Sequence, residues 1–185
     1  MLKNIRENLL VFILYIILFI VQWFLINFFQ DLEIAIAASL IYLPHGLRVI
    51  AIILAGAKIL PGLFLSHVVT GFYIQFTDQL ILIEDIIAII LTSIGGTLSA
   101  YIAIYLLKLY YGKYPEITIK NILIIALIAS IINSLTSNLV YNFTYISWEF
   151  SSQFILFILG DLIGAIIVFY FLKLIYSLIK KDINI

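Results

Sequence analysis

Long apolar runs separated by short polar stretches fill the sequence. A helix needs about 20 such residues to cross a hydrocarbon core of roughly 30 Å. The pattern therefore predicts an all-α fold, a polytopic integral membrane bundle of about six transmembrane helices. The expected helices cover Leu9–Phe29, Leu32–Ala57, Leu60–Phe76, Leu82–Leu107, Ile122–Tyr145 and Ser152–Ile179.

The second of these runs contains an unusual segment, Leu43–Arg48, with a proline, a histidine, a glycine and an arginine among apolar residues. Pro44 cannot donate a hydrogen bond to the carbonyl of Leu40 and its ring clashes with that group. We therefore expect the second helix to be kinked or broken at Pro44. A broken or re-entrant pair of helices is the alternative to a single bent one.

Charged residues separate into two sets when the connections between the expected helices are numbered alternately. Because Lys and Arg are retained on the cytoplasmic side, this separation predicts a multi-pass protein of the bacterial inner membrane with both termini in the cytoplasm. The basic set comprises Lys3, Arg6, Lys58, Lys108, Lys113, Lys120, Lys173, Lys180 and Lys181. The opposite set, without Lys or Arg, comprises Asp31, Glu33, Asp78, Glu84, Asp85 and Glu149.

Composition supports the lipid bilayer as the solvent of this chain. Of the 185 residues, 65% are hydrophobic and only 11% are charged, whereas a soluble domain has roughly a quarter charged residues. We expect a single domain over residues 1–185 and a first helix too long to be a cleaved signal segment. A net charge of zero gives no argument for nucleic acid, and the absence of cysteine excludes disulfides and thiolate sites.

Ionisable residues at membrane depth carry the functional hypothesis. Arg48 and Asp161 both fall near the middle of their expected helices, where a lone charge is costly. We therefore predict that the two side chains pair across the bundle, with His45 or His67 nearby. Either the pair only fixes helix register, or these groups line a ligand-binding or coupling site. The residues proposed for that site are Tyr42, His45, Arg48, His67, Asn133, Asn138 and Asp161.

Several small residues have an expected structural role. Gly95 and Gly96 belong to a small-residue ridge that favours close helix packing. Gly160 and Gly164 flank Asp161, where a partner backbone can approach the carboxylate. The fifth expected helix has a polar face at spacings of three and four residues that either joins helices by hydrogen bonds or lines a hydrated pocket. That face comprises Ser130, Asn133, Ser134, Ser137, Asn138, Tyr141 and Asn142.

The residue patterns of common enzymes are missing. The chain contains no glycine-rich phosphate loop, no Ser-His-Asp pattern and no paired carboxylates at catalytic spacing. Its two histidines lack the spacing of a metal site. We therefore expect a protein that is not an enzyme and that carries neither a cofactor nor a metal.

Three groups of motifs resemble the first class of bacterial membrane-associated sensor domains. The matching segments are Tyr42–Gly46 with Gly56–Ser66, Gly95–Tyr101 and Phe157–Gly164, and the matching positions include Pro44, Gly46, Pro61, Gly62, Gly160 and Asp161. Such domains precede cytoplasmic kinase or cyclic-dinucleotide output domains and are thought to sense a ligand. With no output domain expected after Lys181, the resemblance implies signal transduction through a separate membrane or cytoplasmic protein.

These observations lead to one main functional hypothesis and two alternatives. The main one is a stand-alone integral membrane sensor domain that binds a small ligand or a partner at the buried polar centre. The first alternative is a substrate-binding or transport subunit of the energy-coupling-factor type, because a kinked helix and a polar helix face also suit a solute site at mid-membrane. The second is a structural subunit of a membrane complex.

Overall fold

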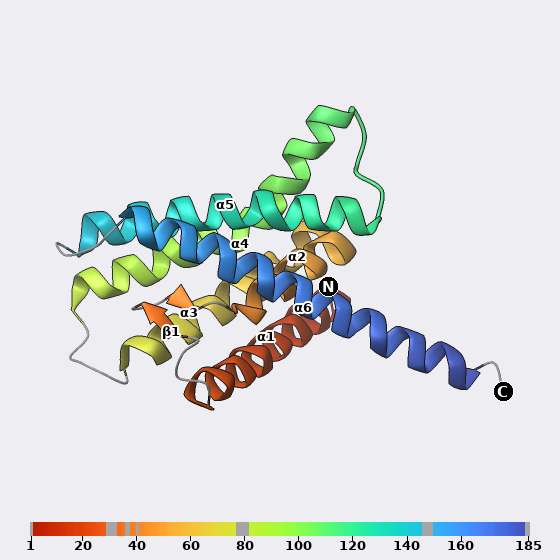
Figure 1. The fold of residues 1–185 in the computed structure, drawn as a ribbon, viewed down its shortest axis with the longest axis horizontal. Coiled ribbons are helices and arrows are strands. Elements are labelled where there is room, and N and C mark those ends of the chain that lie inside the picture. Colours follow the sequence, from red (N-terminus) through yellow and green to blue (C-terminus); the bar gives the residue numbers. More distant parts are fainter. Residues whose placement is uncertain are drawn as a thin grey trace.

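Most of the described residues form six α-helices (Figure 1). The computed structural model describes residues 2–28, 33–35, 38–39, 41–76, 82–145 and 150–183. Two very short strands, β1 and β2, pair antiparallel, with Glu33 opposite Ser39. A short 3-10 helix, η2, joins α2 to α3. The elements are α1 (Leu2–Phe28), β1 (Glu33–Ala35), β2 (Ala38–Ser39), α2 (Leu43–Ala55), η2 (Gly56–Ile59), α3 (Leu60–Phe76), α4 (Ile83–Tyr111), α5 (Ile119–Thr144) and α6 (Phe150–Ile183).

The prediction of a helical membrane bundle is confirmed at the level of composition and length. Five stretches of the described chain are long and apolar enough to cross a bilayer, one fewer than the six helices expected from the sequence. They are Lys3–Ile26, Leu43–Ile74, Ile83–Tyr111, Ile119–Thr144 and Phe150–Leu178. This architecture is that of a multi-pass membrane protein.

The second expected helix, Leu32–Ala57, does not form as one helix. Instead, β1 and β2 occupy part of this run, and α2 begins only at Leu43. This helical part, α2, is short and is counted together with α3 in the single stretch Leu43–Ile74, which accounts for the difference in number. Pro44 lies in the first turn of α2, so it starts a helix and does not kink one. This position suits proline, because the first N–H groups of a helix have no intrahelical partner.

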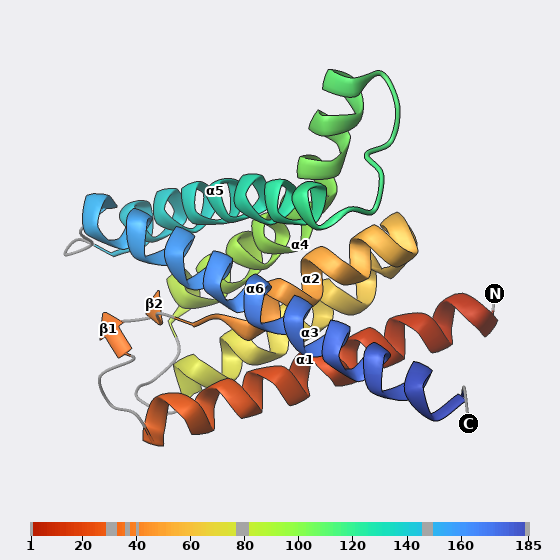
Figure 2. The same ribbon diagram turned by 45° about the vertical axis from the view of Figure 1, so that its right-hand side comes forward.

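The chain reverses direction between α2 and α3. Gly56 has a φ of 69°, a left-handed conformation that favours glycine, and η2 follows it directly. In Figures 1 and 2, α2 runs toward the end of the bundle where α1 begins, and α3 returns from it. The 32-residue stretch Leu43–Ile74 is therefore a pair of shorter helices. Pro61 and Gly62 follow this reversal and belong to the first turn of α3.

Small residues and apolar side chains form the core between the helices. Ala100 and Ala103 of α4 and Ala126 and Ala129 of α5 are buried in this core. A Cβ atom at Gly95 would overlap the side chain of Thr136 on α5. The small-residue ridge expected on the fourth helix thus lies at a close crossing with α5, as helix packing in membranes favours.

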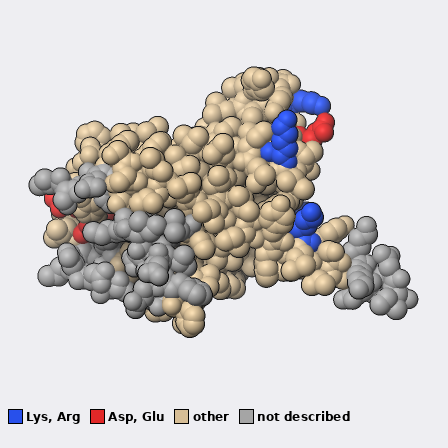
Figure 3. Space-filling view, viewed as in Figure 1, with Lys and Arg blue, Asp and Glu red and all other residues tan. Residues whose placement is uncertain are grey.

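Charge is distributed unequally between the two ends of the bundle. In Figure 3, Lys and Arg atoms gather at the right-hand end, over the α4–α5 connection and over α6, while Asp and Glu atoms lie at the opposite edge. Among the described residues, Glu116 is an acidic group at the basic end, where it pairs with Lys113. The expected acidic residues Asp31, Asp78 and Glu149 lie outside the described residues, as do the side chains of Glu33, Lys180 and Lys181.

The start of α2 is held inside the bundle by two other helices. The backbone N–H of Leu43 donates to Oε1 of Gln22 on α1 at 3.1 Å, and that of Tyr42 donates to the carbonyl of Gly160 on α6 at 2.9 Å. Leu43 and Gln22 are buried, so these contacts satisfy backbone donors that would otherwise be costly to bury.

Replacing Gln22 with methionine is expected to lower the free energy of unfolding by about 1–2 kcal/mol, since the buried N–H of Leu43 loses its acceptor while side-chain volume is kept. Detergent-induced unfolding of purified protein measures this loss. The exposed Trp23→Met on the same helix serves as control. Equal stability of the two variants would contradict this role for Gln22.

Candidate functional site: a buried polar centre

Arg48 and Asp161 meet in the middle of the bundle, as the sequence predicts. Nη2 of Arg48 on α2 lies 3.9 Å from Oδ1 of Asp161 on α6. Arg48 is fully buried and Asp161 is 1% exposed. A cation and a carboxylate at this depth stabilise each other, because the surroundings screen their attraction far less than water does.

Two further side chains contact the carboxylate of Asp161 directly. Nδ2 of Asn133 on α5 donates to Oδ2 at 2.6 Å, and Nδ1 of His45 lies 3.1 Å from the same oxygen. The amide oxygen of Asn133 in turn lies 3.5 Å from Nη1 of Arg48. The four side chains therefore form one network that joins α2, α5 and α6, which we call the polar centre.

His45 can occupy two protonation arrangements within this network. Its Nδ1 also lies 3.0 Å from Nη2 of Arg48, and its Nε2 lies 3.3 Å from Oγ of Ser130. With a proton on Nδ1, the ring donates to Asp161. With Nδ1 bare, its single lone pair accepts from Arg48. The tautomer of His45 therefore decides whether its Nδ1 bonds to Asp161 or to Arg48.

His67 reaches the polar centre from α3, across Gly96 of α4. A Cβ atom at Gly96 would overlap Nη1 of Arg48 and the ring of His67, so both side chains lie against this glycine. The His67 ring also packs against Tyr15, with 6.1 Å between ring centroids. The absence of a side chain at Gly96 is what allows an arginine and a histidine from different helices to share one site.

Four buried polar atoms around this point have no hydrogen-bond partner among the described residues. They are Nε of Arg48, Nδ1 of His67, Oγ of Ser93 and Oγ1 of Thr97. Ser93, Gly96 and Thr97 share one face of α4 because they are spaced at three and four residues. Leaving such groups buried without partners costs about 1–3 kcal/mol each.

The other predicted site residues are placed as follows. The ring of Tyr42 lies 5.6 Å from the guanidinium carbon of Arg48, and its hydroxyl is 2.9 Å from that of Tyr15. Asn138 is fully buried, but its amide donates to Ser134, one turn earlier on α5. These hydrogen bonds of Asn138 lie within α5, whereas Asn133 contacts Asp161 on α6.

The glycines of the sequence motifs mainly allow helices to cross closely. A Cβ atom at Gly46 would lie 2.8 Å from the backbone of Gly164 and Ala165 on α6, and one at Gly164 would overlap the carbonyl of Tyr42. Gly62 of α3 lies against the backbone of Asn8 on α1, and neither helix supplies a member of the four-residue polar centre. Gly160 supplies the carbonyl that accepts from Tyr42.

The sequence does not predict three of the residues around the polar centre. Tyr15, Ser93 and Thr97 are all buried. Tyr15 stands within an apolar run, whereas Ser93 and Thr97 belong to the small-residue segment Thr92–Ala100. The spacing of Ser93, Gly96, Thr97 and Ala100 at three and four residues is the signal that marks a small, polar face on α4. Nothing comparable in the sequence marks Tyr15.

Comparison with known proteins gives no match to any family model, curated protein or solved structure. Among the described residues, no group of three His, Asp or Glu side chains is placed to hold a metal ion. The side chains of the polar centre offer hydrogen bonding and charge pairing.

Proposed function

We propose that this chain is an integral membrane sensor-type domain that binds a small polar ligand at the polar centre. The observation that carries the proposal is a set of buried groups without hydrogen-bond partners among the described residues. Two of them belong to Arg48 and His67, which lie against Gly96, and two belong to Ser93 and Thr97, which share the face of α4 with that glycine. A polar ligand seated there would supply the missing hydrogen bonds. The short motifs that resemble bacterial sensor domains support the same function.

We propose that helix α2 transmits the effect of ligand binding to other parts of the protein. It is only 13 residues long, it carries both His45 and Arg48, and it ends at the turn of Gly56. Its backbone lies against α6 at Gly46 and Gly164. A ligand that draws Arg48 toward α4 would shift α2 against α6, and we propose that α6 passes this change to a separate signalling protein.

The distribution of charge supports an orientation for this relay. The basic end of the bundle in Figure 3 also holds the start of α1 and the end of α6. Under the rule that Lys and Arg stay in the cytoplasm, we propose that both termini are cytoplasmic and that the membrane is the bacterial inner membrane. The signalling partner would then meet α6 on the cytoplasmic side.

The unpartnered hydroxyls provide the test of the binding site. In the ligand-free protein, Ser93→Ala with Thr97→Val is expected to raise the free energy of unfolding by about 1 kcal/mol or more, because two unsatisfied groups are removed. The same double variant should lose the response to ligand. A thermal-stability screen of the purified protein against a metabolite library measures both effects.

A ligand at one hundred times its Kd should stabilise the wild type by about 2.7 kcal/mol, a rise in Tm of about 5–11 °C for a chain of this size. The matched control is Ser99→Ala on the same helix, whose hydroxyl already donates to the carbonyl of Gly96, and it should keep the ligand response. Absence of any stabilising compound, or an unchanged response in Ser93→Ala with Thr97→Val, would contradict the proposal.

A substrate-binding or transport subunit is the second candidate, and one observation favours it. Helix α2 starts within the bundle after a non-helical segment at Ile41–Tyr42, and helices that are interrupted inside a bundle form solute sites in transporters. Solute uptake by vesicles containing this chain alone, or copurification with a pair of ATPases, would favour transport. Copurification with a kinase or cyclase would favour the sensor.

A further inference from the structure

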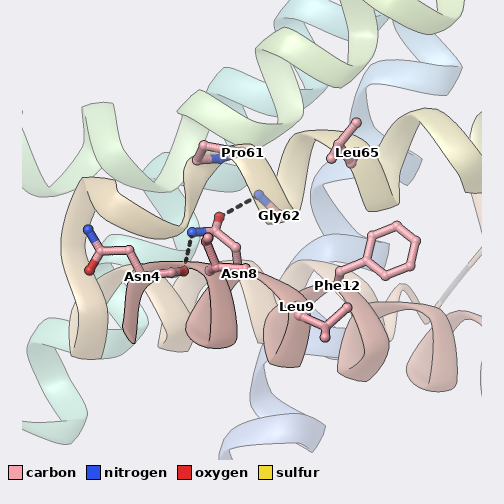
Figure 4. A pocket seen from close by; sticks show the side chains of 8 residues that line it. Asn4, Asn8, Leu9, Phe12, Pro61, Gly62 and Leu65 are labelled. Carbon is pink, nitrogen blue, oxygen red and sulfur yellow. Dashed lines mark hydrogen bonds between the residues drawn. The ribbon is translucent and has the colours of Figure 1, made fainter. Parts of the chain in front are cut away.

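A groove lies on the outer surface of the bundle between the start of α1 and the start of α3 (Figure 4). It has a volume of about 540 Å³ and is lined chiefly by Ile5, Leu9, Phe12, Pro61 and Leu65. Ile5, Leu9 and Leu65 are each more than half exposed. Nothing in the polar centre accounts for this surface, which lies on a different pair of helices.

The groove is a fixed feature of the fold, because its floor is tied together. The side chain of Asn8 donates to the carbonyl of Lys58 at 2.8 Å and accepts from the backbone N–H of Gly62 at 2.7 Å. The absence of a side chain at Gly62 brings α3 against the backbone of α1 at this point. The two walls are therefore held at a set separation.

The groove changes character along its length. Its outer end lies at Asn4, at the start of α1, and its inner end lies at Phe12, roughly 12 Å further along the helix. That length is close to the roughly 15 Å of one leaflet's hydrocarbon layer. A polar entrance and an apolar interior, aligned with the helices, match the amphipathic form of a phospholipid.

The charges near the entrance are predominantly positive. Lys3, Arg6 and Lys58 lie at this end of the bundle with Glu7, so three cations and one carboxylate leave two formal positive charges. Lys58 pairs with Glu7 at 2.8 Å. Lys3 and Arg6 are exposed and form no ion pair within the described part of the chain.

We propose that this groove binds an anionic phospholipid, with one acyl chain along Leu9, Phe12 and Leu65 and the phosphate near Lys3 and Arg6. The charge favours an anionic headgroup over a zwitterionic one, because each basic residue near the membrane surface attracts anionic lipid. The site is separate from the polar centre and does not depend on the function proposed for it.

Native mass spectrometry of the full chain tests this assignment. The protein is released from nanodiscs containing equal amounts of phosphatidylglycerol and phosphatidylcholine with the same acyl chains. The wild type is expected to retain phosphatidylglycerol preferentially. Lys3→Gln and Arg6→Gln should each reduce that preference about fivefold, and Leu65→Trp, which fills the groove, should reduce the retention of both lipids.

The control is Leu127→Trp, at an exposed position on α5, which should leave lipid retention unchanged. Equal retention of the two lipids by the wild type would overturn the anionic preference. Equal retention by Leu65→Trp and Leu127→Trp would overturn the groove as the site. Retention of a second copy of the chain that is lost in Leu65→Trp would show that another protein molecule covers this surface.

Discussion

Replacing Arg48 with leucine is expected to lower the free energy of unfolding by about 3–5 kcal/mol, the typical cost of removing one member of a buried ion pair. The substitution leaves the buried carboxylate of Asp161 without its cation and removes the donor to Asn133. Unfolding of the purified protein by a denaturing detergent, followed by the loss of helical signal, measures the difference.

The same change at an exposed arginine provides the control. Arg6 lies at the start of α1 and is exposed, so Arg6→Leu should change stability by no more than about 0.5 kcal/mol. The comparison separates the effect of the buried site from the effect of adding an apolar side chain. An Arg48→Leu variant as stable as Arg6→Leu would mean that the polar centre does not support the fold.

Replacing Gly164 with alanine is the second large effect that we expect, a loss of about 3 kcal/mol. The added Cβ would overlap the carbonyl of Tyr42 and lie 2.9 Å from the backbone nitrogen of Leu43. Because both neighbours are backbone atoms, neither can rotate away, and overpacking of this kind forces helices apart. Thermal unfolding in detergent measures the loss.

Gly71→Ala on α3 is the matched control. Its added Cβ would lie 3.0 Å from a methyl carbon of Ile89, a side chain that can move aside, while alanine itself favours the helix by up to about 1 kcal/mol. We therefore expect Gly71→Ala to be close to neutral. Equal losses in Gly71→Ala and Gly164→Ala would contradict a close α2–α6 crossing as the reason for the glycine.

Much of the fold follows from the sequence because its longest apolar runs allow few alternatives. Helices α1, α4, α5 and α6 each exceed 20 residues, and a run of that length in a chain with so few charges is typical of a membrane helix. The proximity of Arg48 and Asp161 was predictable for a related reason. Two isolated charges at membrane depth are costly unless they meet.

The region before α2 could not be predicted in the same way. Glu33–Tyr42 is nearly as apolar as the helix that follows it, and a continuous apolar run does not distinguish extended chain from helix. Pro44 suits both a kink and a helix start. Tertiary contacts place the start of α2 at Leu43, because Gln22 and Gly160 supply hydrogen-bond acceptors for the backbone there.

The sequence predicts the positions of some members of the polar centre but not of others. His45 and Arg48 could be assigned to one helix face from their spacing of three residues. Asn133 and Asn138 look alike on the polar face of α5, yet only Asn133 contacts Asp161 in the described structure. Their difference depends on how α5 is rotated against α6, which the periodicity of a single helix does not specify.

Whether Arg48 and Asp161 act as one unit is tested most directly by a double-mutant cycle. The cycle compares the stabilities of Arg48→Leu, Asp161→Asn and the combined variant in the same detergent. We predict that the combined variant is more stable than Arg48→Leu alone, because it leaves no unpaired buried charge. Losses that add within about 0.5 kcal/mol would show that the two residues are independent and would contradict a shared polar centre.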